Sequence, residues 1–176
     1  GLMIRSRQVC VYPGLVKKMV DDLYVDECEG GRVVVDRALG GCSKLNAVVD
    51  TIKKNGAGAG AGAGAGEGCE VAKKIVFCHF RQEIDELMAR LEAEGVRCVA
   101  IDGRTNQAQK ETILQGTDAE VLVLQIQTCC EGLNLQEYSQ VYFISPHWNP
   151  AVEEQAVGRC HRMGQTKQVK VFRFHM

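Results

Sequence analysis

Short runs of strand-forming apolar residues recur along residues 69–176, separated by polar or glycine-containing segments. Val, Ile and Phe, which favour β-strands, are frequent in them. Two runs, 121–124 and 141–144, are continuously apolar, which is typical of parallel strands covered on both faces. Two further strands are predicted over residues 74–78 and 96–101. The alternating segment 169–174 predicts a strand at the edge of the sheet.

Segments with helical periodicity lie between these runs. An i, i+3, i+4, i+7 pattern is formed by Ile84, Leu87, Met88 and Leu91. It predicts an amphipathic helix that ends at Gly95. Further helices are predicted over residues 106–115 and 150–163, the latter capped by Asn149 with a proline in its first turn. This alternation predicts an α/β fold, a parallel sheet with helices on both faces.

An alternating Gly-Ala tract separates two parts of the chain. Residues 56–66 alternate strictly between glycine and alanine, and a Glu-Gly pair follows. Because glycine-rich segments have high backbone entropy and little side chain to pack, we expect a flexible linker over residues 56–68. The predicted organisation is an N-terminal arm over residues 1–55, with helices at 15–23 and 43–52, and a compact body over residues 69–176.

Composition and charge are those of an ordinary globular protein. The 176 residues are 45% hydrophobic and 24% charged, and the formal net charge of −1 argues against a general polyanion binder. The longest apolar runs are strand-sized, so we expect no membrane-spanning helix. After Glu154 there is no acidic residue, whereas five basic residues follow. This basic end either faces phosphate or is simply solvated.

The nine cysteines predict neither a disulfide framework nor a metal site. No Cys-x-x-Cys spacing occurs, and the count is odd. Free thiols inside apolar patterns behave as small hydrophobic side chains. We therefore expect a protein of a reducing intracellular compartment that binds no metal of its own.

Polar and aromatic residues follow the predicted strands. In an open parallel sheet, ligands bind beyond the carboxyl ends of the strands, so these loops are candidate sites. The segments concerned are 79–81, 102–105, 127–135 and 145–150.

The predicted helix over residues 150–163 presents a polar row beside an apolar stripe. At about 100° per residue, Gln155, Arg159 and Arg162 fall within roughly 60° of one another. Neither Glu153 nor Glu154 is spaced to pair with both arginines. Two guanidinium groups in such a row suit the charge on a transferring phosphoryl group, and the alternative is two surface arginines in ordinary ion pairs. The stripe that should pack on the sheet contains Val152, Ala156, Cys160 and Met163.

Several of these segments resemble a known family. Residues 149–156 and 159–165 resemble motif VI of the Swi/Snf family of helicase-like, DNA-translocating ATPases of superfamily two, and residues 131–135 resemble the end of its motif V. Apart from the Gly-Ala insert, the resemblance covers nearly the whole chain. Other segments that match the family's order and spacing are 5–13, 43–45, 77–80 and 102–105.

The resemblance implies a RecA-like second lobe of a two-lobe motor, a P-loop NTPase-like fold without its own phosphate loop. In this family the motif VI arginines reach across a cleft to ATP, which the first lobe holds with Mg²⁺. By position these catalytic residues are Arg159 and Arg162, with Gln155 nearby. Motif V would line the nucleotide cleft through Gly132, Glu131 and Asn134.

The resemblance also implies partners and a location. The partners are double-stranded DNA or nucleoprotein and the N-terminal RecA-like lobe of the same protein, and the expected location is the nucleus. A translocase contacts the DNA backbone and does not read the sequence. The implied DNA-contacting residues are Arg81, Gly103, Arg104, Thr105, Thr128 and Trp148.

Two departures from the family pattern and one missing motif bear on activity. Family members usually have small residues at 129–131, where this chain has Cys-Cys-Glu, and an acid at 158, where it has glycine. No GxxxxGK[ST] string occurs, and the acidic segment 26–29, which has no phosphate loop before it, reads as an exposed turn. We therefore expect that the chain alone does not hydrolyse ATP.

Two other functions remain open on the residues alone. A cysteine hydrolase would use Cys129 or Cys130 as nucleophile and His147 or His161 as base, although no third orienting residue stands out. A non-catalytic domain that binds a protein partner would share the same fold and differ only in the chemistry of its site.

Overall fold

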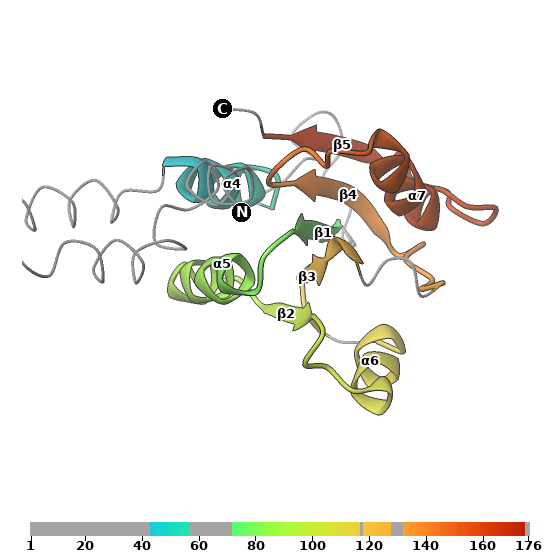
Figure 1. Ribbon diagram of the computed structural model, residues 1–176, viewed down its shortest axis with the longest axis horizontal. Helices are drawn as coiled ribbons and strands as arrows, with labels where there is room; N and C mark the ends of the chain where they lie inside the picture. The colour runs from blue at the N-terminus through green and yellow to red at the C-terminus, as the bar shows by residue number, and fades with distance from the viewer. Residues whose placement is uncertain (1–42, 57–71, 117, 128–131, 175–176) are drawn as a thin grey trace, which may run out of the picture.

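The computed structural model describes residues 43–56, 72–116, 118–127 and 132–174. The predicted helix at 15–23 and most of the Gly-Ala tract lie outside this part of the chain. No helix within it is both long enough and apolar enough to cross a bilayer. Its elements are α4 (Ser43–Lys54), β1 (Lys73–Cys78), α5 (Arg81–Ala93), β2 (Cys98–Ile101), α6 (Gln107–Leu114), β3 (Val121–Gln125), β4 (Tyr138–Phe143), α7 (Pro150–Cys160) and β5 (Lys170–Arg173), as labelled in Figure 1.

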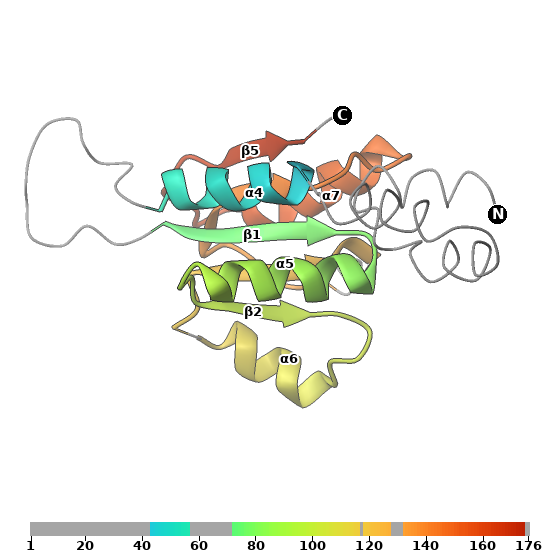
Figure 2. The same ribbon diagram turned by 90° about the vertical axis from the view of Figure 1, so that its left-hand side faces the viewer.

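The five strands form one parallel sheet in the order β2-β3-β1-β4-β5. Figure 2 shows the arrowheads of β1, β2 and β5 pointing the same way. The chain runs from β1 outward to β2, returns to β3 beside β1, and then crosses to β4 on the other side of β1. Because parallel crossovers are right-handed, connections that run in opposite directions pass over opposite faces. The predicted α/β fold is confirmed, and β5 lies at an edge as predicted.

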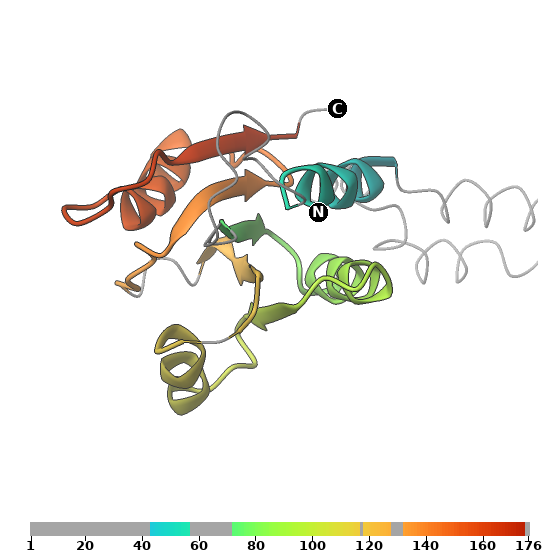
Figure 3. The ribbon, with the colours of Figure 1, turned by 180° about the vertical axis from the view of Figure 1, so that it is seen from behind.

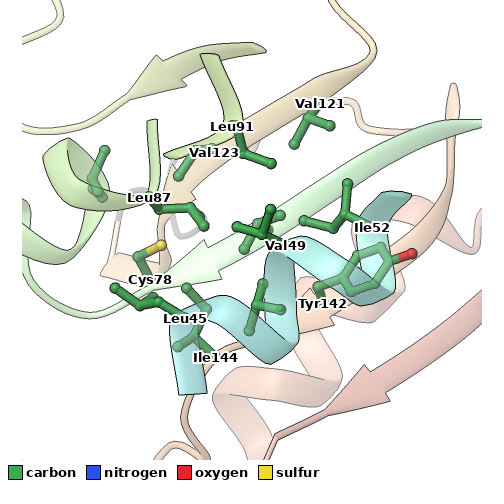
Figure 4. Close-up of a cluster of buried hydrophobic side chains, with 13 residues drawn as sticks. Leu45, Val49, Ile52, Cys78, Leu87, Leu91, Val121, Val123, Tyr142 and Ile144 are labelled. Carbon is green, nitrogen blue, oxygen red and sulfur yellow. The ribbon is translucent and has the colours of Figure 1, made fainter. Parts of the chain in front are cut away.

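Alternate side chains of each strand build two hydrophobic cores, one on each face of the sheet. The first contains Val76, Val123 and Tyr142 and packs against α4 and α5. Figure 4 shows Val123 and Tyr142 of this core together with Leu45 of α4 and Leu87 of α5. The second contains Phe77 and Leu124 and packs against α7, with apolar side chains of α6 at its border. Figure 3 shows from behind that α6 and α7 lie on the side away from α4 and α5. Each fully buried aliphatic or aromatic side chain contributes about 1.5–3 kcal/mol of hydrophobic stabilisation.

Helix α4, which comes from the predicted N-terminal arm, forms part of the first core. At its end, Asn55 Nδ2 donates to the Tyr142 hydroxyl (3.1 Å), which donates to Gln140 Oε1 (2.7 Å). The helix therefore covers β1 and β4 and carries its own polar anchor. Its buried apolar side chains are Leu45, Val48, Val49 and Ile52.

Local capping residues set several helix ends where the sequence predicts them. Asn106 Oδ1 accepts the Gln109 N–H (2.8 Å), and Asn149 Oδ1 accepts the Ala151 N–H (3.1 Å). Gly95 follows α5 with a φ of 72°, a conformation that favours glycine. These ends depend on neighbours in sequence, which is why sequence reasoning finds them.

Helix α7 ends at Cys160, three residues before the predicted end. The carbonyl of Arg159 accepts the Leu135 N–H (3.3 Å), and the carbonyl of Met163 accepts from Gln136 Nε2 (2.9 Å). These hydrogen bonds tie the two carbonyls to Leu135 and Gln136, which lie in the segment before β4. The chain then turns at Gly164, whose φ is 102°. The placement of Met163 in the apolar stripe was therefore wrong, because its side chain is 98% exposed.

Candidate functional site

The carboxyl ends of β1 and β4 meet where the chain changes direction across the sheet. His79 follows β1, and its Nε2–H donates to the carbonyl of Ser145, which follows β4 (3.0 Å). Lys44 of α4 is buried here and donates from Nζ to Ser145 Oγ (3.1 Å). In parallel sheets such a reversal point is a common ligand position. In this chain the side chain of His79 connects the two loops at this point, and Lys44 of α4 bonds to the second of them.

A row of rings extends from this bridge to the surface. The rings of His79 and His147 stack with centroids 5.4 Å apart, and Trp148 lies 5.7 Å from His147. Trp148 is 81% exposed. Tryptophan, with its large apolar ring and polar N–H, is enriched at interfaces, so this ring is suited to a contact with a partner.

Asp102, directly after β2, organises the neighbouring loop. Its carboxylate accepts the backbone N–H of Arg104 (2.8 Å) and the Arg104 Nε–H (2.7 Å), and its own N–H donates to Thr105 Oγ1 (3.1 Å). Burial acts to raise the pKa of Asp102, but the hydrogen bonds from Arg104 outweigh it, so this pKa lies below its ordinary value. The loop is thus built around a buried anion.

Arg104 is held by a second carboxylate as well. Its Nη2 donates to Asp85 Oδ1 of α5 (2.6 Å). Hydrogen bonds to Asp85 and Asp102 raise the pKa of Arg104, so its charge is permanent. Gly103 lies against Arg81, since a Cβ at position 103 would come within 2.9 Å of Arg81 Nη2. The structure therefore brings together four residues for which the resemblance implies DNA contact, namely Arg81, Gly103, Arg104 and Thr105.

The motif VI arginines lie elsewhere, toward the other end of α7. This helix begins at the carboxyl edge of the sheet and runs back to the segment that precedes β4, where Leu135 bonds to Arg159. Arg159 is half-buried and Arg162 is exposed. Within the part of the chain that the structure describes, no carboxylate pairs with either guanidinium.

The predicted polar row is only partly present. Gln155 and Arg159 lie on α7, with Gln155 exposed, but Arg162 lies beyond its end, so a helical wheel does not describe it. Gly132 has a φ of 76°, and Asn134 Oδ1 accepts the Gln136 N–H (3.4 Å). The remaining predicted site residues, Glu131 and Thr128, lie outside the described residues.

Sequence reasoning did not predict the structural roles of Glu153 and Lys44. On the helical wheel Glu153 points away from the polar row, yet its side chain is only 8% exposed and forms an ion pair with Arg173 of β5 (2.8 Å). That partner is twenty positions away, so no local pattern reveals it. Lys44 belongs to a segment noted for its resemblance, but its contact with Ser145 crosses 101 positions.

The described thiols do not support cysteine catalysis. Burial raises the pKa of Cys160 to about 12 and that of Cys98 to about 11. A thiol in that state is a poor nucleophile. The two cysteines named for a hydrolase, at 129 and 130, lie outside the described residues. Their candidate bases lie beyond opposite ends of α7, His147 before its first residue and His161 after its last.

Comparisons with a family model and with known sequences indicate the same family. The helicase conserved C-terminal domain matches residues 68–164. The DNA repair protein RAD5A of Arabidopsis thaliana is 40% identical over 107 residues, which are 58% of this chain and 10% of that protein. The ATP-dependent helicase rhp16 of Schizosaccharomyces pombe is 35% identical over 103 residues, 56% of this chain and 12% of that protein.

A solved structure agrees with these sequences. The C-terminal part of the Fun30 ATPase domain superposes with a TM-score of 0.55 at 26% identity, over 58% of this chain and 34% of that one. The chain spans about a tenth of the length of the curated relatives it matches. The chain belongs to the helicase conserved C-terminal domain family, and its fold is that of a RecA-like C-terminal ATPase lobe.

Proposed function

We propose that this chain is the second lobe of a two-lobe, DNA-dependent ATPase that acts on chromatin or damaged DNA in the nucleus. Relatives whose names specify DNA repair, an ATP-dependent helicase and a chromatin regulator support this class. The N-terminal RecA-like lobe of the same protein would bind ATP and Mg²⁺. The present lobe would complete the nucleotide site and contact the DNA backbone.

The proposal depends most on Arg159 and Arg162, which pair with no carboxylate within the described part of the chain. Among the described arginines, Arg90, Arg104 and Arg173 hold carboxylates, whereas Arg159 and Arg162 hold none. A guanidinium without an internal anion keeps its full attraction for phosphate, and its planar donors match phosphate oxygens. These side chains therefore fit a triphosphate that another lobe holds, with Gln155 on the same helix nearby.

The transition state of phosphoryl transfer gives these arginines their catalytic role. Negative charge spreads over the equatorial oxygens, and an arginine that approaches them stabilises that charge. ATP and Mg²⁺ supply the reactive phosphoryl group and its counter-charge. What this chain contributes is cationic donors, with Gly132, Glu131 and Asn134 proposed along the nucleotide cleft.

The carboxyl edge of the sheet is the proposed DNA contact. Gly103, Arg104 and Thr105 lie in the loop after β2, and Arg81, the first residue of α5, lies against Gly103. Exposed Trp148 lies on the loop after β4. Thr128 is proposed as a further backbone contact. Since such contacts go to phosphate and sugar, affinity should fall steeply with salt and depend little on sequence.

An ATPase assay on the chain joined to its N-terminal lobe tests the nucleotide role. Arg159→Ala and Arg162→Ala should each lower the DNA-stimulated kcat by about 10³-fold, the scale of a lost arginine finger. Arg97→Ala is the matched control, because Arg97, which is exposed like Arg162, pairs with no carboxylate among the described residues. The present chain without that lobe should show no turnover. Undiminished kcat in both arginine variants would contradict the proposal.

A further inference from the structure

Glu153 joins three elements at the carboxyl edge. It lies in the first turn of α7, where its Oε1 accepts the backbone N–H of His147 (2.7 Å) and its Oε2 accepts the Nε–H of Arg173 on β5 (2.8 Å). The side chain is 8% exposed. A buried carboxylate with two directional bonds holds its partners far more firmly than an exposed one does.

Both partners of Glu153 are themselves fixed. The guanidinium of Arg173 lies over the Phe143 ring, 5.6 Å from its centroid, so the ion pair is tied to the end of β4. Burial acts to raise the pKa of Glu153, but the hydrogen bonds from Arg173 and from the His147 N–H outweigh it and lower the pKa. The carboxylate therefore stays ionised at neutral pH and keeps both bonds.

The loop that Glu153 holds carries the exposed tryptophan. His147 is bound to Glu153 through its backbone, stacks on His79 and accepts the Asn149 N–H at its Nδ1 (3.1 Å). Trp148 comes next in the chain and points into solvent. Its backbone is thus anchored on one side by Glu153 and on the other by the start of α7, while its ring is open to a partner.

We propose that Glu153 is a positioning residue that fixes the Trp148 loop to the first turn of α7. The tryptophan and the arginine-bearing end of α7 then belong to a single rigid body, because one helix connects them. The rigidity holds for this chain on its own. Its use for holding DNA rests on the proposed function above.

The only tryptophan of the chain makes the first test specific. Time-resolved fluorescence anisotropy of the 176-residue chain reports Trp148 alone. Glu153→Gln removes the charge that holds Arg173 and should add a fast local reorientation of the indole. Glu154→Gln is the matched control, because it removes the same charge from an exposed neighbour, and its decay should equal that of the wild type. An unchanged decay in Glu153→Gln would overturn the proposal.

Variants of Arg173, the ion-pair partner of Glu153, control for a folding defect in Glu153→Gln. Arg173→Gln should give the same fast component as Glu153→Gln, and Arg173→Lys, which keeps the charge, should restore much of the slow decay. Circular dichroism spectra that match the wild type show which variants are folded. If folded Arg173→Gln kept the wild-type decay, the ion pair would have no positioning role.

A DNA titration then separates this inference from the proposed function. Double-stranded DNA added to the wild type should change the Trp148 emission, and Glu153→Gln should bind about threefold to tenfold more weakly, because the loop must be ordered on binding. Binding by the wild type with equal affinity in Glu153→Gln would overturn the inference. No response of the wild type to DNA would contradict the proposed DNA contact, and the anisotropy result would then decide the positioning role by itself.

Discussion

The carboxyl edge of the sheet and the far end of α7 hold their arginines in opposite ways. At the edge, Arg104 is bound by Asp85 and Asp102, in a loop closed by hydrogen bonds. At the end of α7, Arg159 and Arg162 meet no carboxylate among the described residues. Over the residues that the structure describes, the first arrangement includes its own anions, whereas the second includes none.

This difference indicates how each region would bind phosphate. An arginine that is already paired must exchange its own carboxylate for a phosphate, which reduces the net gain from binding. An unpaired arginine gives up only water. A sliding contact with DNA, which must form and break repeatedly, suits the first type, and stabilisation of a charge that develops during reaction suits the second.

Of the two substitutions that test this comparison, removal of the buried carboxylate of Asp102 should have the larger effect. Asp102→Asn keeps an acceptor for the Arg104 backbone but loses the charge, and should lower the free energy of unfolding by about 1–3 kcal/mol at pH 7. The folded pKa of Asp102 lies below its ordinary value, so its stabilisation is present above that value and is lost as pH falls through the folded pKa. Urea unfolding at neutral and acidic pH measures both effects.

The control for this change is Asp118→Asn, an exposed aspartate outside the loop. Its stability should match that of the wild type at each pH. If Asp102→Asn were as stable as the wild type at pH 7, the loop would not depend on the buried anion, and the contrast between the two regions would weaken.

Releasing Arg104 from α5 should have the smaller effect. Asp85 and Arg104 are both more than half exposed, so their pairing is weak and easily exchanged. Asp85→Asn should raise the affinity of the chain for DNA by about twofold to fivefold and make its salt dependence steeper. Glu86→Gln, one position along α5, is the charge-matched control, and equal gains in both variants would show a general charge effect.

Much of the fold follows from local patterns in the sequence. The apolar runs at 121–124 and 141–143 lie in central strands, and Asn149 caps the helix that it was expected to cap. The helix expected from residue 106 begins there as well, with Asn106 as its cap. These features depend on residues only a few positions apart. The carboxyl-edge loops then meet because parallel strands end on the same side.

The errors concern interactions between distant positions. Nothing near Met163 in sequence shows that Leu135 and Gln136 engage the carbonyls at the end of α7. Likewise, the ion pairs of Glu153 with Arg173 and of Asp85 with Arg104 join separate elements. Periodicity places a side chain on a face, but only the tertiary fold shows which charge it meets.

Binding of a transition-state mimic tests the central claim most directly. On the chain joined to its N-terminal lobe, the affinities for ADP and for ADP with aluminium fluoride would be measured for the wild type and for Arg159→Ala. The account predicts a loss of about 10²-fold or more for the fluoride complex, and little change for ADP, because the arginine acts on the charge of the transferring group. Equal losses for both ligands, or no loss for either, would contradict it.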